Sequence, residues 1–164
     1  MTFERHVVLV QPEIHWNTGN IGRSCLGAGA SLHLIRPLGF SLDDKKVKRA
    51  GLDYWHDVDL HTWDDFDQFL AQMAVKNNEV ALFAKTGKTP FWNLPDQKRL
   101  FLVFGSETRG LSDAIRNRFD ASQTYFIPIS DRIRSLNLSS AATVALYESL
   151  RPAGPSFHAW STDL

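Results

Sequence analysis

Three segments of the chain combine glycine with polar side chains, and each follows an apolar run of strand length. They are NTGNIGR (17–23), VFGSETRGL (103–111) and IPISDRIRSLNLSSA (127–141). Such segments supply backbone amides, carbonyls and hydroxyl groups but few ionisable side chains. A site built from them suits an adenosine-like ligand better than a highly charged one. Arg23 ends the first segment and is a candidate for chemistry on a bound substrate.

Each segment also has an ordinary structural interpretation, because glycine, asparagine and serine are typical of turns and helix caps. The first segment, 17–23, has three readings: a phosphate cradle, a helix cap, or a turn that delivers Arg23. All three segments would emerge at the carboxyl edge of a parallel sheet, where open α/β folds bind ligands. We therefore interpret them as parts of one site.

The chain lacks the glycine patterns that bind nucleotide phosphates. Gly19 and Gly22 are three residues apart, with no third glycine at the offset of a dinucleotide fingerprint. The stretch TGKT (86–89) resembles the end of a P-loop, but Leu82 stands where that motif needs glycine, and Pro90 follows. These departures argue against a nucleoside triphosphate or dinucleotide site.

Metal and nucleophile chemistry are not indicated. The six histidines include no pair at i and i+4, and His56 and His61, with Asp57 and Asp59 beside them, lack a recognisable ligand spacing. Cys25 is the single cysteine, so it forms no intrachain disulfide, and we expect a buried packing residue. We expect no metal.

The elements that must position the three segments are readable from the hydrophobic pattern. Helical spacing predicts a helix over 63–77 with Thr62 as its N-cap, a second one capped by Ser112, and a third over 137–150. Continuous apolar runs, typical of strands buried on both faces, lie at 6–11, 31–37, 79–85, 99–105 and 124–129. The alternation predicts an α/β fold, a mostly parallel sheet with helices on both faces.

Composition sets the broad class. A chain of 164 residues has room for one domain, which we assign to 1–151, followed by a tail at 152–164. Eighteen basic residues balance eighteen acidic ones, which argues mildly against non-specific coating of nucleic acid. No apolar stretch is long enough to span a membrane, so we expect a cytoplasmic protein.

Taken in order, the three segments resemble the three motifs of the SPOUT superfamily of RNA methyltransferases, in its TrmH-like branch. The stretch GFSLDDKKVKRAGLDYW (39–55) is similar to the minimal TrmL type. Members of that type methylate the ribose 2′-hydroxyl of the tRNA wobble nucleotide, cytidine(34) or uridine(34). The resemblance covers about residues 5–151.

The resemblance implies a parallel-sheet domain whose C-terminal part forms a deep trefoil knot, and a homodimer that binds tRNA. It also implies S-adenosylmethionine as cofactor, bound in a bent form, and S-adenosylhomocysteine as product. Carried over by position, the implied cofactor-binding residues are Phe83, Thr86, Gly105, Glu107, Ile127, Ser135, Leu136 and Ser140.

The same resemblance makes Arg23 the catalytic candidate, either as the base that takes the 2′-hydroxyl proton or as a clamp on an RNA phosphate. Asn17 and Asn137 would support the site by hydrogen bonds, and Tyr147 would contact substrate or a second subunit. The implied RNA-binding cations are Lys45, Lys46, Lys48, Arg49, Arg132 and Arg134.

One departure concerns the residues before the first motif, where His15 and Trp16 replace the two prolines common in minimal members. Trp16 would stack on a base or simply pack. Two alternatives to the wobble position stay open. One is the same reaction on ribosomal or another RNA, and the other is a non-catalytic RNA-binding module.

Overall fold

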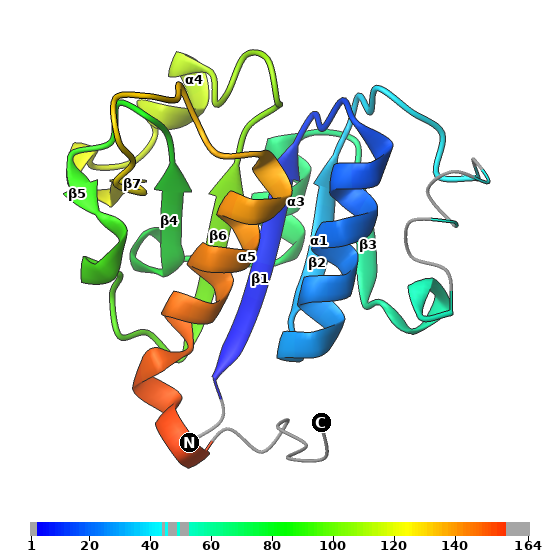
Figure 1. Cartoon of the computed structure of the whole chain (residues 1–164), viewed down its shortest axis with the longest axis horizontal. Coiled ribbons are helices and arrows are strands. Elements are labelled where there is room, and N and C mark those ends of the chain that lie inside the picture. Colours follow the sequence, from blue (N-terminus) through cyan, green and yellow to red (C-terminus); the bar gives the residue numbers. More distant parts are fainter. Residues whose placement is uncertain (1–2, 44, 46–48, 50–52, 157–164) are drawn as a thin grey trace.

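The computed structural model describes residues 3–43, 45, 49 and 53–156. Within them, seven strands form one sheet in the order β3-β2-β1-β6-β4-β7-β5, and every paired neighbour is parallel (Figure 1). The strands are β1 (Glu4–Val10), β2 (Ser31–Ile35), β3 (Leu60–Trp63), β4 (Val80–Phe83), β5 (Thr89–Pro90), β6 (Arg99–Phe104) and β7 (Thr124–Phe126). The predicted α/β class and parallel sheet are confirmed.

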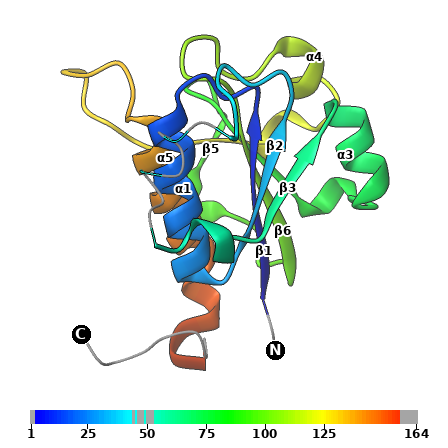
Figure 2. The ribbon, with the colours of Figure 1, turned by 90° about the vertical axis from the view of Figure 1, so that its right-hand side faces the viewer.

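Helices cover both faces of the sheet, as the sequence predicts. The helices α1 (His15–Ala28) and α5 (Leu138–Ser149) lie side by side on one face, while α3 (Phe66–Gln72) covers the other (Figure 2). The short helix α4 (Asp113–Arg116) follows β6. Single turns of 3-10 helix are η1 (Trp55–Asp57), η2 (Asn77–Glu79), η3 (Phe91–Asn93) and η4 (Ala121–Gln123), and η5 (Arg151–Ser156) is a longer 3-10 segment kinked at Gly154.

The core consists of two apolar layers, one on each face of the sheet. The central strand β6 shows why its sequence is apolar throughout. Leu100 and Leu102 point into the layer under α1 and α5, while Phe101 and Val103 point into the layer under α3. All four side chains are fully buried, so this strand contributes to both apolar layers of the core.

The predicted start of the helix over 63–77 is wrong. Thr62 lies in β3, paired with Leu34 of β2, and does not cap a helix. The cap is Asp65, whose carboxylate accepts the N–H of Gln68 at 2.7 Å. β3 contains the β-branched Thr62 and the aromatic Trp63, and its four residues are half-buried, which suits an edge strand better than a first helical turn.

The segment 17–23 lies inside α1, so it is neither the predicted turn that delivers Arg23 nor a helix cap, since the N-cap of α1 is Ile14. Glycine inside a helix costs about 1 kcal/mol relative to alanine, so its presence needs a packing reason. Gly22 has one, because a Cβ there would lie 2.5 Å from the Trp55 ring. Farther along, Ser24 and Thr143 join α1 to α5 through hydroxyls 2.6 Å apart. The small residues allow neighbouring elements to approach α1 closely.

The chain continues past the predicted end of the domain as ordered structure. η5 includes residues 151–156, and Ala153 is buried, with its N–H donating to the carbonyl of Leu150 at 2.9 Å. The rest of the predicted tail, 157–164, lies outside the described residues.

Candidate active site

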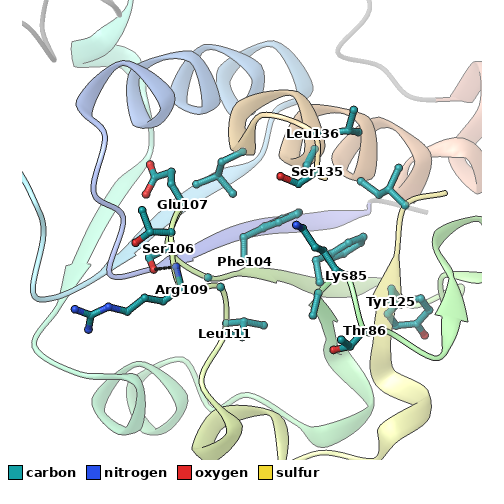
Figure 3. A pocket seen from close by; sticks show the side chains of 18 of the residues that line it. Lys85, Thr86, Phe104, Ser106, Glu107, Arg109, Leu111, Tyr125, Ser135 and Leu136 are labelled. Carbon is teal, nitrogen blue, oxygen red and sulfur yellow. Dashed lines mark hydrogen bonds between the residues drawn. The ribbon is translucent and has the colours of Figure 1, made fainter. Parts of the chain in front are cut away.

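A cavity of about 690 Å³ opens at the carboxyl ends of β4, β6 and β7 (Figure 3). It lies beside the topological switch point between β1 and β6, from which the strand order runs toward opposite edges of the sheet. Parallel α/β sheets bind ligands at this position. The lining residues come from those three strands, the loops after them, α4 and the first turn of α5: Phe83, Ala84, Lys85, Thr86, Phe104, Gly105, Ser106, Glu107, Thr108, Arg109, Gly110, Leu111, Arg116, Tyr125, Ile127, Ile129, Ser135, Leu136, Asn137, Leu138 and Ala141.

The floor of the cavity is aromatic. The rings of Phe83 and Phe104 stack with centroids 4.7 Å apart, and Tyr125 lies 6.0 Å from Phe83 on the other side. The strand register produces this row, because Phe83 pairs with Phe104 on one neighbour and with Tyr125 on the other. Burial raises the pKa of Tyr125, so its phenol is neutral at physiological pH. A row of flat apolar groups suits a planar base.

The second wall is a tight loop after β6. Gly105 permits no side chain, since a Cβ there would lie 1.9 Å from the carbonyl carbon of Gly110. Gly110 itself has φ +65°, which favours glycine, and its N–H donates to the carbonyl of Ser106 at 2.9 Å. The two glycines therefore set the shape of this wall by allowing its backbone segments to pack closely. The side chain of Glu107 extends from the loop toward the start of α1.

Glu107 connects the cavity to the start of α1. Its carboxylate accepts the backbone N–H groups of Glu13 at 2.7 Å and Ile14 at 3.0 Å, and the Asn17 side-chain amide at 3.3 Å. Ile14 is the N-cap residue of α1 and supplies no side-chain cap. Glu107 thus satisfies free amides beside the helix from a distant loop, and its negative charge faces the positive end of the helix dipole.

The third wall is the segment 127–137, which projects beside α1 and α5 (Figure 2). Its end is fixed by Asn137, whose side-chain oxygen accepts the N–H of Ser139 at 2.9 Å and its hydroxyl at 2.7 Å. This is the N-cap of α5. Ser135 and Leu136 are held at the cavity just before it (Figure 3).

Seven of the eight residues assigned to the cofactor line this cavity, and Asn137 lines it with them. Ser140 does not line it, although Leu138 and Ala141 on α5 do, and Ser140 is exposed on that helix. Sequence reasoning missed Phe104, Tyr125 and Arg116. Phe104 was detectable as the last apolar residue before Gly105, whereas Tyr125 becomes visible only when the pairing of β4 with β7 is known.

Arg23 does not line the cavity. It is exposed on α1, with its guanidinium carbon 5.2 Å from the centre of the Tyr54 ring. It follows Asn17 by six residues, a rise of about 9 Å along the helix axis. Asn17 does reach the site through Glu107, and its side-chain oxygen is buried without a hydrogen-bond partner among the described residues.

The basic residues assigned to RNA lie on exposed surface where they are described. Lys45 and Arg49 are exposed, as are Arg132 and Arg134 on the segment 127–137. Lys46 and Lys48 lie outside the described residues. Tyr147 is 37% exposed on α5, and its hydroxyl lies where a side chain at position 27 of α1 would touch it.

The remaining expectations concern metals, membranes and Cys25. In the described part of the chain, no group of three or more His, Cys, Asp or Glu side chains could hold a metal ion. No described helix is long and apolar enough to cross a membrane. Cys25 is a fully buried residue of α1, and burial raises the pKa of its thiol to about 12, so the prediction of a packing residue is confirmed.

The family described as SpoU rRNA Methylase matches residues 4–147. The chain belongs to this family. A tRNA (cytidine(34)-2'-O)-methyltransferase of Burkholderia pseudomallei is 44% identical over 149 residues, which cover 91% of this chain and 96% of that protein.

Solved structures of family members have the same fold. One, described as giving structural insights into the 2-OH methylation of C/U34 on tRNA, superposes with a TM-score of 0.83 at 43% identity, covering 91% of this chain and 95% of that one. The SpoU methyltransferase AviRb from Streptomyces viridochromogenes, in complex with AdoMet, superposes with a TM-score of 0.75 at 26% identity. That match covers 90% of this chain and 57% of AviRb.

Proposed function

We propose that this protein transfers a methyl group from S-adenosylmethionine to the ribose 2′-hydroxyl of the wobble nucleotide, cytidine(34) or uridine(34), of tRNA. The observation that carries the proposal is 44% identity to a tRNA (cytidine(34)-2'-O)-methyltransferase across 96% of that protein's length. The three-walled cavity at the carboxyl edge of the sheet supports it, since two of its walls come from the second and third motif segments, 103–111 and 127–141. The first segment adjoins them through the hydrogen bond from Asn17 to Glu107.

The cavity fits S-adenosylmethionine. Its aromatic floor suits the adenine ring, and its walls present backbone and hydroxyl groups to the ribose. The side-chain Nε of Arg116, on the cavity wall, is buried without a partner in the described chain, as expected of a donor near a polar ligand. The cofactor supplies an electrophilic methyl group on its sulfonium. The residues that hold it are Phe83, Thr86, Gly105, Ile127, Ser135 and Leu136.

Arg23 acts on the RNA. A ribose hydroxyl is a poor nucleophile until its proton is removed or polarised, and a guanidinium is normally protonated in proteins. A clamp on the adjacent phosphate, which orients the ribose, therefore suits this side chain better than the role of base. Its exposure on α1 leaves it accessible to a phosphate.

A second copy of the chain completes the site. Arg23 does not line the cavity of its own protomer, so it serves the cavity of a partner in a homodimer. The apolar side chains on the outer surface of α1 and α5 support this arrangement: Leu26 is 36% exposed, Val144 42% and Tyr147 37%. The C-terminal part of each chain forms a deep trefoil knot, a proposal consistent with α5 returning from the sheet edge to pack against β1, β6 and α1. The cytoplasm, where tRNA is modified, is the proposed location.

Methylation of purified tRNA isoacceptors tests the function. The protein is incubated with S-adenosylmethionine and each tRNA, and the modified nucleotide is located by mass spectrometry. We expect one 2′-O-methyl group, at nucleotide 34, with S-adenosylhomocysteine released in equal amount. If a parallel reaction with ribosomal RNA gave the only methylated product, ribosomal RNA would be the substrate in place of tRNA. Absence of both cofactor binding and methyl transfer would favour a non-catalytic RNA-binding module.

A further inference from the structure

Arg116 occupies the rim between two cavities. It lies at the end of α4 and lines both the large cavity and a second one of about 260 Å³ beside it. Thr86, in the loop after β4, lines the same two cavities. The two residues therefore belong to the partition that bounds one side of the cofactor cavity.

A hydrogen bond joins these two residues across the partition. Nη1 of Arg116 donates to Oγ1 of Thr86 at 2.8 Å. Nη2 bonds the carboxylate of Asp113, one turn earlier on α4, which restrains the guanidinium in this orientation. The side chain of Arg116 is 31% exposed, so water competes with these bonds only in part.

The backbone of the loop that carries Thr86 is anchored to β7, on the side away from Arg116. Its backbone bonds run toward β7: the N–H of Ala84 donates to the carbonyl of Tyr125 at 3.0 Å, and that of Lys88 to Thr124 at 2.8 Å. Thr86 and Arg116 thus link this loop to the segment after β6. Two walls of the cavity, each following a different strand, are connected at their rim by one side-chain pair.

We propose that Arg116 is a positioning residue that holds the Thr86 loop against α4 and thereby sets the affinity for S-adenosylmethionine. The identity of the ligand rests on the proposed function. A wall ordered before the ligand arrives loses less conformational entropy on binding, so the bond strengthens cofactor binding even without touching the cofactor. The buried, unpartnered Nε of Arg116 adds a donor that faces no protein acceptor in the described chain.

The test is calorimetric titration of S-adenosylmethionine into Arg116→Leu, Thr86→Val and the double variant. A hydrogen bond to a partly exposed charged group predicts a rise in Kd of about five- to twentyfold for Arg116→Leu. Thr86→Val should give a smaller rise in Kd, since the Nε donor stays. The double variant should bind no more weakly than Arg116→Leu, because the two residues form one interaction. Thr86→Ser keeps the hydroxyl and should therefore bind S-adenosylmethionine with the wild-type Kd.

Steady-state kinetics separate positioning from general damage. For Arg116→Leu we expect KM for S-adenosylmethionine to rise, with kcat and KM for tRNA within about twofold of wild type. Arg118→Leu is the matched control, since Arg118 lies two residues further on, pairs with Asp67 and lines neither cavity. Its cofactor affinity should equal that of wild type.

The outcomes distinguish the two proposals. A wild-type Kd in both Arg116→Leu and Thr86→Val, with the unmodified protein binding the cofactor normally, would overturn the role of Arg116 and leave the proposed function intact. Strictly additive losses in the double variant would also overturn it. Failure of the unmodified protein to bind S-adenosylmethionine would refute the proposed function, and the role of Arg116 with it.

Discussion

The two ends of the parallel sheet differ in whether their buried polar side chains find hydrogen-bond partners. At the amino end, Arg5 is 2% exposed, and its guanidinium donates to five oxygens, among them the carbonyl of Ser149 at 2.8 Å. At the carboxyl end lie all three buried side-chain atoms that have no hydrogen-bond partner in the described chain: Asn17 Oδ1, Thr18 Oγ1 and Arg116 Nε. Since buried polar atoms are normally paired, the unpaired ones mark where a ligand or partner is needed.

The same residue types therefore have different functions at the two ends. Arg5 is structural because its donors are satisfied by its own chain, whereas Arg116 keeps one donor, its Nε, without a partner in the described chain. The comparison predicts that substitutions at the amino end change stability and leave ligand binding alone. Substitutions at the carboxyl end should do the reverse, with Glu107 as an informative exception.

The largest effect is expected from Arg23→Ala. Loss of a group that positions or activates the reacting hydroxyl should reduce methyl transfer about 10²- to 10⁴-fold. The Kd for S-adenosylmethionine should stay within about twofold, because Arg23 lies outside the cavity of its own protomer and its proposed ligand is an RNA phosphate. Single-turnover transfer to tRNA and calorimetry measure the two quantities. Arg36→Ala, at an exposed arginine that pairs weakly with Asp64 at 3.8 Å, is the control. Wild-type turnover in Arg23→Ala would remove Arg23 from the mechanism.

Arg5→Met tests the other end. Burial lowers the pKa of Arg5 to about 10, so the side chain is still charged at pH 7. Its loss removes the guanidinium donors from the carbonyls of Ser149, Gln97 and Lys98, of which Lys98 keeps the N–H of Glu4 at 2.7 Å. We expect the free energy of unfolding to fall by about 3 kcal/mol, as measured by urea denaturation. Arg151→Met, at an exposed arginine on the same face, should change it by less than about 1 kcal/mol. Weaker cofactor binding by folded Arg5→Met would break the comparison.

Glu107→Gln sharpens the comparison, because Glu107 lies at the carboxyl end but has its acceptor sites filled by Glu13, Ile14 and Asn17. The amide keeps one acceptor oxygen and loses the charge that faces the start of α1. We expect the free energy of unfolding to fall by about 1 kcal/mol and methyl transfer to fall about tenfold as α1 shifts. Asp64→Asn, at an exposed carboxylate that pairs weakly with Arg36 at 3.8 Å, should leave both unchanged. Full activity in a destabilised Glu107→Gln would make Glu107 purely structural.

The sheet and the place of the site could be predicted from the sequence, because both follow from local pattern. Strands such as β6 are continuously apolar, and a parallel strand pair requires a crossover between its members, so the polar segments after them had to share one edge. The cofactor walls follow from the same reasoning, since Gly105 and Ser135 each stand just beyond a strand or just before a helix.

What could not be predicted depends on pairing between distant segments. The start of α1 looks like a turn in isolation, and it is helical because Trp55 packs on Gly22 and Glu107 satisfies the amides before it. Tyr125 joins the cavity floor only through its register with Phe83. The short strand β5 has two residues and no pattern of its own. None of these contacts leaves a periodic signal in the sequence.

The smallest effect concerns a buried chain of hydrogen bonds on the α3 face, toward the amino end. The Trp63 indole N–H donates to Nδ1 of His33 at 3.1 Å, so the proton of neutral His33 is on Nε2 and is donated to Nδ1 of His6 at 2.9 Å. His6 in turn donates from Nε2 to Glu4 at 2.8 Å. A second proton on His33 would have to displace the indole from Nδ1.

His33 should therefore make the protein less stable as pH falls. Burial, aided by the nearby His6 and His61, lowers the pKa of His33 to about 3, against about 6.5 for an unfolded histidine, although Asp59 acts in the opposite direction. Below pH 6.5 the unfolded chain takes up a proton that the folded chain does not. The free energy of unfolding should thus fall by at most about 1.4 kcal/mol per pH unit from this residue. This contribution is best read between about pH 6.5 and 4.5, above the range where the carboxylates titrate.

His33→Gln, compared with wild type by urea denaturation at several pH values, isolates this contribution. Glutamine retains a donor and an acceptor for His6 and Trp63 but does not titrate, so the slope of unfolding free energy against pH should become shallower, whatever the loss at pH 7. His56→Gln, at an exposed histidine, should keep the wild-type slope. The Kd for S-adenosylmethionine should not differ between the three proteins at any of these pH values beyond a common trend. A cofactor affinity that followed His33 would show that the two ends of the sheet are coupled, and the separation of stability from binding would fail.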